Sequence, residues 1–341
     1  MPPRAASLAS VFALLLAGCA DPPAAADASV VDAVTQDLAL PDASEKDAAV
    51  DDDVPVDAAA RDVVLGEFPS VTCERYDRQE DAGALSTPEI NEASGLVESR
   101  TRPGAFYVHN DSGDTARFFA ISLSGALLAE YRLPGAAAVD FEDITAGPCG
   151  ATTCVYLGDI GDNPGLRSNV TVYRVEEPTP PEAPPSTVTP VDLTWTSVTF
   201  RYPDRGHDAE TLLTDPATGE LYLITKVVRG PVTVYRVPTA DGGVAQPVTE
   251  MTIPEGAGQL TGGDVRPDGR AMLLRTYARV LVYERGPMAP FTDLFLSAPR
   301  AVDSVIEPQG ESVAWRLDGR GYVTVSEGRS VRINRFQCAS P

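Results

Sequence analysis

The feature that most constrains the fold of this chain is an internal repeat that begins near residue 92. Each unit has an acidic residue, a short apolar strand, a turn, and a second strand that ends in a polar group. Five such units follow one another, and their opening acidic residues are 47 to 68 residues apart. These openers are Glu92, Glu142, Glu210, Asp264 and Glu311. Almost no helical periodicity interrupts them, so the repeat predicts an all-β fold.

A period of this length with about four strands per unit is typical of a β-propeller. We therefore predict five antiparallel blades, with six blades as the main alternative and a β-sandwich or solenoid as further ones. The last unit has only three strands before the chain ends. A segment around Val71–Cys73 is expected to supply its outer strand, because closing the ring removes exposed edges.

The five cysteines suggest an exported protein with two disulfides. Cys149 and Cys154 flank a turn, which favours a local bridge. A bridge between Cys73 and Cys338 would fasten the two ends of the predicted propeller. Other pairings, or free buried thiols, remain alternatives.

The N-terminus indicates export with a lipid anchor. Residues 1–18 contain Arg4, an apolar run too short to span a bilayer, and small residues before Cys19. The sequence Leu16-Ala17-Gly18-Cys19 resembles the lipobox of bacterial lipoproteins, which implies that Cys19 carries the lipid. Ala20 after it favours the outer membrane. The alternative is an ordinary secreted protein.

Residues 19–65 are predicted to be an extended stalk beyond the lipid-bearing cysteine. They contain Ala, Asp, Val and Pro without an aromatic residue, and an aspartate recurs every five residues from Asp27 to Asp62. That period matches neither a helix nor a strand, and the like charges repel. A calcium-binding array is the alternative interpretation. Residues 66–341 then form the propeller domain, and their net negative charge disfavours nucleic acid as a partner. We expect a monomer.

The repeat also predicts where a site would lie. The first strand of each blade lines the central channel, so the five acidic openers are expected to form a carboxylate ring at one mouth. Crowded carboxylates attract a cation, and oxygen ligands suit Ca²⁺, so the openers are candidate calcium ligands. Further candidates at the second-strand ends are Asn110, Asp111, Asp114, Asp159, Asp162 and Asn163. The alternative is that these acidic and amide groups only cap turns and blade edges.

Positive groups stand near the same strand ends. Lys226 and Arg275 are candidate ligands for a small anionic molecule, together with His109. His207, next to Asp208-Ala-Glu210, is a candidate acid/base. His207, Glu210, Lys226 and Arg275 are thus the candidate catalytic residues, with ordinary structural roles for the histidines as the alternative.

The openers Glu92-Ala-Ser-Gly-Leu, Phe141-Glu-Asp-Ile, Asp208-Ala-Glu and Gln309-Gly-Glu-Ser-Val resemble those of phytase-like and esterase-like propellers. They are also similar to openers of other calcium-dependent six-bladed enzymes and of NHL-type binding propellers. The resemblance covers about residues 71 to 338. It implies that calcium and basic residues, here Lys226 and Arg275, would hold a phosphate group.

The sequence leaves two functions open. The favoured one is a lipid-anchored surface propeller that binds a ligand or envelope partner at its carboxylate-lined mouth without catalysis, because no catalytic motif is complete. The alternative is a calcium-dependent hydrolase of phosphate esters or lactones at the same mouth.

Overall fold

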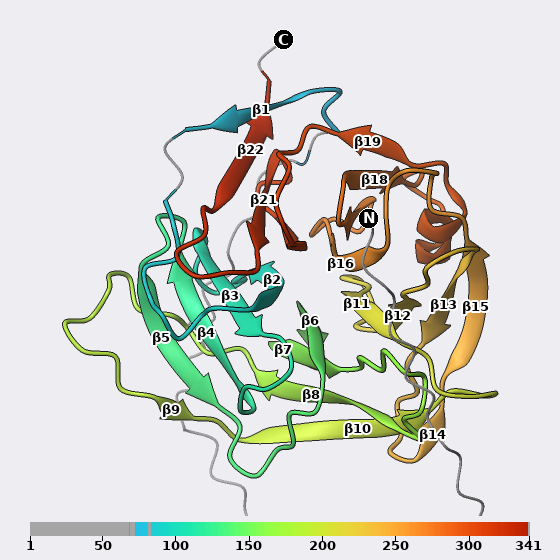
Figure 1. Ribbon diagram of the computed structural model, residues 1–341, viewed down its shortest axis with the longest axis horizontal. Helices are drawn as coiled ribbons and strands as arrows, with labels where there is room; N and C mark the ends of the chain where they lie inside the picture. Colours follow the sequence, from blue (N-terminus) through green and yellow to red (C-terminus); the bar gives the residue numbers. More distant parts are fainter. Residues whose placement is uncertain (1–67, 69–71, 81–82, 340–341) are drawn as a thin grey trace, which may run out of the picture. The chain divides into compact units, whose positions relative to one another are not determined.

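The computed structural model describes residue 68 and residues 72–80 and 83–339 (Figure 1). The predicted signal peptide, lipid-bearing Cys19 and acidic stalk lie outside the described residues. Within the described residues, no helix is long and apolar enough to cross a membrane. The only helical element that those residues form is a 3-10 helix, η1 (Phe291–Leu296).

The described chain forms five antiparallel blades around a central axis, which confirms the predicted five-bladed propeller (Figure 1). The first blade contains β2 (Ala93–Glu98), β3 (Ala105–Asn110), β4 (Arg117–Ser122), β5 (Leu127–Arg132) and β9 (Val191–Asp192). The second contains β6 (Phe141–Cys149), β7 (Thr152–Asp159), β8 (Val170–Glu176), β10 (Trp195–Arg201) and β14 (Gly243–Val244). The third contains β11 (Ala209–Thr214), β12 (Leu221–Thr225), β13 (Val232–Arg236) and β15 (Gln246–Met251). The fourth contains β16 (Leu260–Val265), β17 (Ala271–Thr276), β18 (Val280–Glu284) and β19 (Arg300–Val302). The fifth contains β20 (Gly310–Trp315), β21 (Gly321–Ser326), β22 (Asn334–Cys338) and β1 (Tyr76–Gln79).

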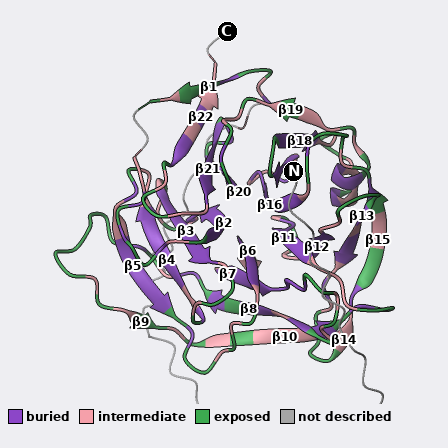
Figure 2. Ribbon diagram, in the orientation of Figure 1, coloured by how far each residue is buried: buried purple, intermediate pink, exposed green. Residues whose placement is uncertain are grey.

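Burial increases from the outer strands of each blade to the inner ones. Every residue of β2, β11, β16 and β20 is buried, whereas most residues of β10 and β15 at the outside are half-buried or exposed (Figure 2). The inner strands contact one another in a closed ring, and the apolar side chains between neighbouring blades form the hydrophobic core. A strand covered on both faces needs apolar side chains on both faces.

The ring closes by pairing the two ends of the domain. β1 pairs with β22 from Tyr76↔Cys338 to Gln79↔Arg335. The prediction of an N-terminal closing strand is therefore confirmed, although the strand begins three residues after Cys73. Disulfides join Cys73 to Cys338 and Cys149 to Cys154, as predicted. Cross-linking residues 265 positions apart lowers the conformational entropy of the unfolded chain, which stabilises the folded state by about 5 kcal/mol in the loop-entropy model.

Two short segments link neighbouring blades. The proline-rich insertion after β8 leads to β9, which adds in parallel to β5 of the first blade. Glu177, where the insertion begins, accepts hydrogen bonds from the Ser99 hydroxyl at 2.8 Å and the Arg100 backbone N–H at 2.7 Å. Likewise, β14 leaves the third blade and adds in parallel to β10 of the second. Each link covers part of an exposed edge strand.

Candidate functional site

A β-bulge recurs at the same place in the inner strand of all five blades. In the second blade, Phe141 pairs with Asp159 and Asp143 with Gly158, so Glu142 is the extra residue. The same irregularity interrupts the pairing of each of the other inner strands with its neighbour. The bulged residues are Ser94, Glu142, Glu210, Thr261 and Glu311, with Gly95 sharing the bulge in the first blade. Bulges re-aim side chains, and here they do so once per blade at one end of the propeller.

This register corrects two members of the predicted ring. Glu92 lies before β2, two residues ahead of the bulged Ser94, and it is exposed. Asp264 lies three residues after the bulged Thr261 and is buried. Its carboxylate accepts backbone hydrogen bonds from Val265 at 2.8 Å and from Trp315 of the fifth blade at 2.7 Å. Serine and threonine, not acids, occupy the bulge in these two blades. Glu92 therefore reaches the mouth from the loop before β2, whereas the prediction that Asp264 lies at the mouth was wrong.

Ser94 and Thr261 fasten blades together instead of extending the ring. The Ser94 hydroxyl donates to the Glu142 carbonyl at 2.6 Å, and the Thr261 hydroxyl donates to the Gly310 carbonyl at 2.9 Å. The predicted ring of five carboxylates is therefore a ring of three glutamates and two hydroxyl residues.

Other acidic side chains gather around these three glutamates at the end where the inner strands begin and the second strands finish, which we call the mouth face. Some of these acids lie two residues before the bulged residue of an inner strand. Others come directly after the end of a second strand. The carboxylate cluster consists of Glu92, Asp111, Asp140, Glu142, Asp208, Glu210, Glu311 and Glu327. Two sets of three have ligand oxygens within 4.8 Å of one another: Asp111, Asp140 and Glu142, and Glu142, Asp208 and Glu210.

Glu142 and Glu210 are the centre of this cluster. Burial raises the pKa of Glu142 well above its usual range, and the charges of Glu210, Asp111 and Asp140 raise it further. Burial also raises the pKa of Glu210 to about 7, although Lys226 opposes the shift. Glu142 and Glu210 each have a carboxylate oxygen within 4.8 Å of the other. Gly161 lies against Glu142 and Asp140, and a Cβ at this position would overlap both carboxylates. The crowding therefore favours a shared proton or a bound cation.

The pKa values of the carboxylates around Glu142 and Glu210 are raised as well. Burial, with the charges of Glu327 and Glu210, raises the pKa of Glu311 to about 8. Burial and the charge of Asp111 raise the pKa of Asp140 to about 6. These interactions run across the axis between different blades, so the cluster acts as one electrostatic unit.

Lys226 is a basic side chain that pairs directly with a member of the carboxylate cluster. Its Nζ lies 2.6 Å from Glu210 Oε1 and 3.2 Å from the Tyr277 hydroxyl, and 5.3 Å from the centre of the Tyr277 ring. Burial lowers the pKa of Lys226, but the charge of Glu210 and their hydrogen bond outweigh it and the net shift is upward. The structure thus places Lys226 at the mouth, where the repeat predicted it.

The other predicted basic residues do not lie with it. Arg275 pairs in register with Gly262, at the position that His109 has in the first blade, one residue before the end of the second strand. Arg275 is fully buried, and its Nη2 lies 2.6 Å from Glu307 Oε2. His109 is also fully buried, which lowers its pKa, and its Nδ1 lies 2.8 Å from the Asn110 carbonyl. Neither is available to a ligand at the mouth.

His207 contacts neither Glu210 nor Lys226. Its Nε2 lies 2.9 Å from Asp204 Oδ1, and its ring packs edge-on against Tyr202. His207 therefore belongs to an aromatic and acidic loop contact beside the cluster.

Most of the additional predicted ligands support the loops. Asn110 Oδ1 accepts from the Asn91 and Glu92 backbone N–H groups, and Asp159 does the same for Val139 and Asp140. Asp114 forms an ion pair with Arg117, and Asp162 accepts hydrogen bonds from the backbone N–H groups of Leu166 and Arg167. Asn163 is exposed. Asp111 alone of these candidates joins the carboxylate cluster.

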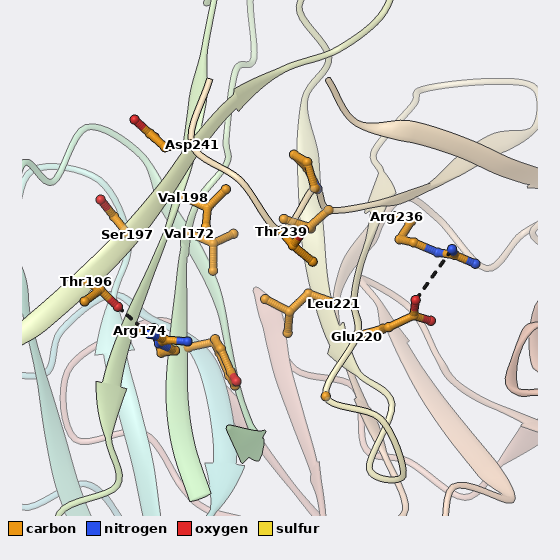
Figure 3. A pocket seen from close by; sticks show the side chains of 14 residues that line it. Val172, Arg174, Thr196, Ser197, Val198, Glu220, Leu221, Arg236, Thr239 and Asp241 are labelled. Atoms are coloured by element: carbon orange, nitrogen blue, oxygen red, sulfur yellow. Dashed lines mark hydrogen bonds and ion pairs between the residues drawn. The ribbon is translucent and has the colours of Figure 1, made fainter. Parts of the chain in front are cut away.

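A separate groove lies on the outside of the propeller between the second and third blades. It has a volume of about 320 Å³ and an apolar floor that includes Val172, Val198 and Leu221 (Figure 3). Arg174 and Arg236 border it, and Arg236 forms an ion pair with Glu220 at 3.5 Å. None of the residues predicted to bind or react lines this groove.

Three members of the cluster, Asp140, Asp208 and Glu327, were not predicted from the sequence. Asp140 and Asp208 precede their bulged glutamates by two residues, and Glu92 stands in the same relation to Ser94. Aligning the units on the bulge would have revealed this second acidic position. Glu327 has no such signal, because the equivalent position in other blades carries Asp111, Ile160, Lys226 and Tyr277.

The fold and the mouth define an all-β propeller with a carboxylate-lined axis. No protein-family profile matches the chain. No curated protein matches it either. Among solved structures the chain is similar to the crystal structure of Raptor from Chaetomium thermophilum, with a TM-score of 0.44 and 9% sequence identity. The match covers 79% of this chain and 29% of that one, so the chain spans less than a third of the length of that protein.

Proposed function

We propose that this chain is an exported, lipid-anchored propeller that binds a positively charged ligand or envelope partner at the carboxylate cluster, without catalysis. One observation carries the proposal: the two sets of three carboxylates share Glu142, and their oxygens converge within 4.8 Å. Carboxylates held this close are mutually destabilised when ionised, and a cation removes that cost.

Ca²⁺ is the ion that we propose for the cluster. It takes 6–8 oxygen ligands and accepts irregular geometry, which fits carboxylates contributed by several blades. Asp111, Asp140 and Glu142 would hold it, since Lys226 already neutralises Glu210.

The contacts of the basic residues favour binding over hydrolysis of phosphate esters. A hydrolase of that class needs cationic groups free to stabilise developing negative charge. Lys226 is paired with Glu210, and Arg275 is buried against Glu307. A small anionic ligand would also be repelled by the surrounding carboxylates.

The test is calcium binding by the purified mature chain, measured by calorimetry and by thermal unfolding with and without EDTA. We expect Ca²⁺ at about 100 times its Kd to stabilise the protein by about 2.7 kcal/mol. Glu142→Gln should abolish this effect, whereas Glu182→Gln, in an exposed loop outside the cluster, should retain it. Unchanged unfolding with Ca²⁺ would rule out the calcium site, and EDTA-sensitive turnover of p-nitrophenyl phosphate or a lactone would favour the hydrolase.

The anchor is tested separately in a bacterial host that processes lipoproteins. We expect the chain to incorporate labelled palmitate and to fractionate with the outer membrane, and Cys19→Ser to abolish the labelling. Labelling that persists in Cys19→Ser would contradict lipidation at this residue.

A further inference from the structure

Exposed apolar side chains surround the carboxylate cluster. Of the eight large apolar side chains that are exposed among the described residues, five lie in loops on the mouth face. These five, which we call the apolar rim, are Val139, Leu166, Val228, Tyr277 and Ile306. They belong to the loops of the second to fifth blades. Ile306, Leu166 and Val228 are 97%, 82% and 80% exposed, so water covers them in the free protein.

Exposed charges of both signs lie in the loops around the carboxylate cluster, together with the apolar rim. Glu89, Asp204 and Glu255 are exposed acids in these loops, and exposed arginines lie there too. These arginines are Arg205, Arg229, Arg279 and Arg329. A complementary surface therefore has a basic group at its centre and apolar groups around it, with acidic groups only where it meets these arginines.

The ammonium group of Lys226 is an internal example of a cation bound by the carboxylate cluster. Lys226 Nζ contacts Glu210 and lies against the Tyr277 ring. Across the axis, no lysine or arginine among the described residues forms an ion pair with Asp111, Asp140 or Glu142. Arg167 lies near enough to lower the pKa of Asp140, but its ion pair at 2.8 Å is with Asp159. One half of the cluster thus has a paired internal cation, whereas the carboxylates of the other half have none paired directly with them.

We infer that the mouth face docks a polypeptide segment that inserts one lysine or arginine side chain against Asp111, Asp140 and Glu142, while its apolar side chains cover the apolar rim. The inference rests on the proposed binding function and specifies its partner. At the centre of many protein interfaces, apolar contacts surround a key residue and exclude water from its interactions. The apolar rim would do the same for the ion pair at the cluster. Ca²⁺ and the basic side chain would compete for the same three carboxylates.

The probe is the synthetic peptide acetyl-Glu-Leu-Val-Lys-Val-Leu-Glu-amide, with a second peptide in which norleucine replaces lysine. Binding to the purified mature chain is measured by calorimetry. We expect the lysine peptide to bind with a Kd below about 1 mM, and the norleucine peptide to bind at least about tenfold more weakly. Added Ca²⁺ should displace the lysine peptide.

Matched variants separate the rim from the rest of the surface. Val228→Ser with Ile306→Ser should weaken peptide binding at least about fivefold, because each removes exposed apolar area from the rim. Met288→Ser with Leu296→Ser changes two exposed apolar residues in the connection between β18 and β19, at the opposite end of the propeller, and should leave binding unchanged.

Three results would overturn the inference: no binding at about 1 mM peptide, equal binding of both peptides, or equal weakening by the two double variants. Calcium binding measured on the same samples distinguishes this failure from that of the proposed function. A chain that binds Ca²⁺ through Glu142 but ignores the lysine peptide would retain the site and lose only the partner.

Discussion

Glu142 and Asp143 are neighbours in β6, and both are buried carboxylic acids, yet their surroundings are opposite in kind. Glu142 faces other carboxylates, among which the charge of Glu210 raises its pKa most. Asp143 accepts backbone hydrogen bonds from Ile144 and Leu212 at 2.9 Å and from Gly263 at 3.3 Å. Those N–H groups belong to the second, third and fourth blades. Burial raises the pKa of both residues, but the backbone donors oppose the shift at Asp143, whereas neighbouring acids add to it at Glu142.

The axis therefore has both a structural and a candidate binding layer. Asp143 and Asp264 join inner strands, whereas the bulged glutamates are aimed at the mouth. Adjacent residues thus contribute to stability and to the candidate binding site, and substitutions at each should affect one property without the other.

The largest effect is expected from Asp143→Ala. Three buried backbone N–H groups from three blades would lose their acceptor, so the free energy of unfolding should fall by about 3–5 kcal/mol. Urea unfolding measures it. Asp143→Asn retains one acceptor oxygen and should lose less. If the alanine variant loses under about 1 kcal/mol, the bonding role assigned to Asp143 is wrong.

A smaller, pH-dependent loss is expected from Lys226→Met. At pH 8 Glu210, with a pKa of about 7, is largely ionised, and without Lys226 its charge would be buried beside other acids. Removing Lys226 should raise the pKa of Glu210 above 7, so that Glu210 is protonated at pH 8 in the folded variant. We expect the free energy of unfolding to fall by about 1.4 kcal/mol at that pH, and by less at pH 5, where Glu210 is protonated in both proteins. Adding Glu210→Gln to this variant should recover most of the lost free energy of unfolding at pH 8. An equal loss at both pH values would show that packing, not charge, is responsible.

The smallest change should come from Glu311→Gln, and its sign is opposite. The pKa of Glu311 in the folded protein, about 8, lies above its value of 4.5 in the unfolded chain, so the folded state binds more protons between these values. The free energy of unfolding of the unmodified protein should therefore decrease as the pH rises from about 4.5 to 8.

Glutamine at this position removes that contribution. At pH 8.5 Glu311→Gln should be more stable than the unmodified protein by on the order of 1 kcal/mol, with a shallower pH dependence. Thermal unfolding across this range, with Glu182→Gln as control, is the measurement. A steeper pH dependence in the Glu311 variant would contradict the electrostatic assignment.

The sequence by itself determined the repeat and its all-β character, and it favoured five blades, the N-terminal closure and the two disulfide pairs over the alternatives that the structure then excluded. Apolar runs at a regular spacing can be buried only by stacking similar units, and a last unit with three strands requires a fourth from elsewhere, which β1 supplies. Cys73 and Cys338 followed from that closure.

Only the tertiary structure decided which acids face the axis. One extra residue in a strand changes the direction of the side chains beside it, and the bulge that does so has no fixed residue type in this chain: serine, threonine and glutamate all occupy it. Asp264 and Arg275 were therefore assigned to the mouth by sequence spacing, although both are buried between blades. Asp140, Asp208 and Glu327 come together only because blades far apart in the sequence meet at one axis, and a carboxylate's charge acts through space on whichever groups the fold places beside it.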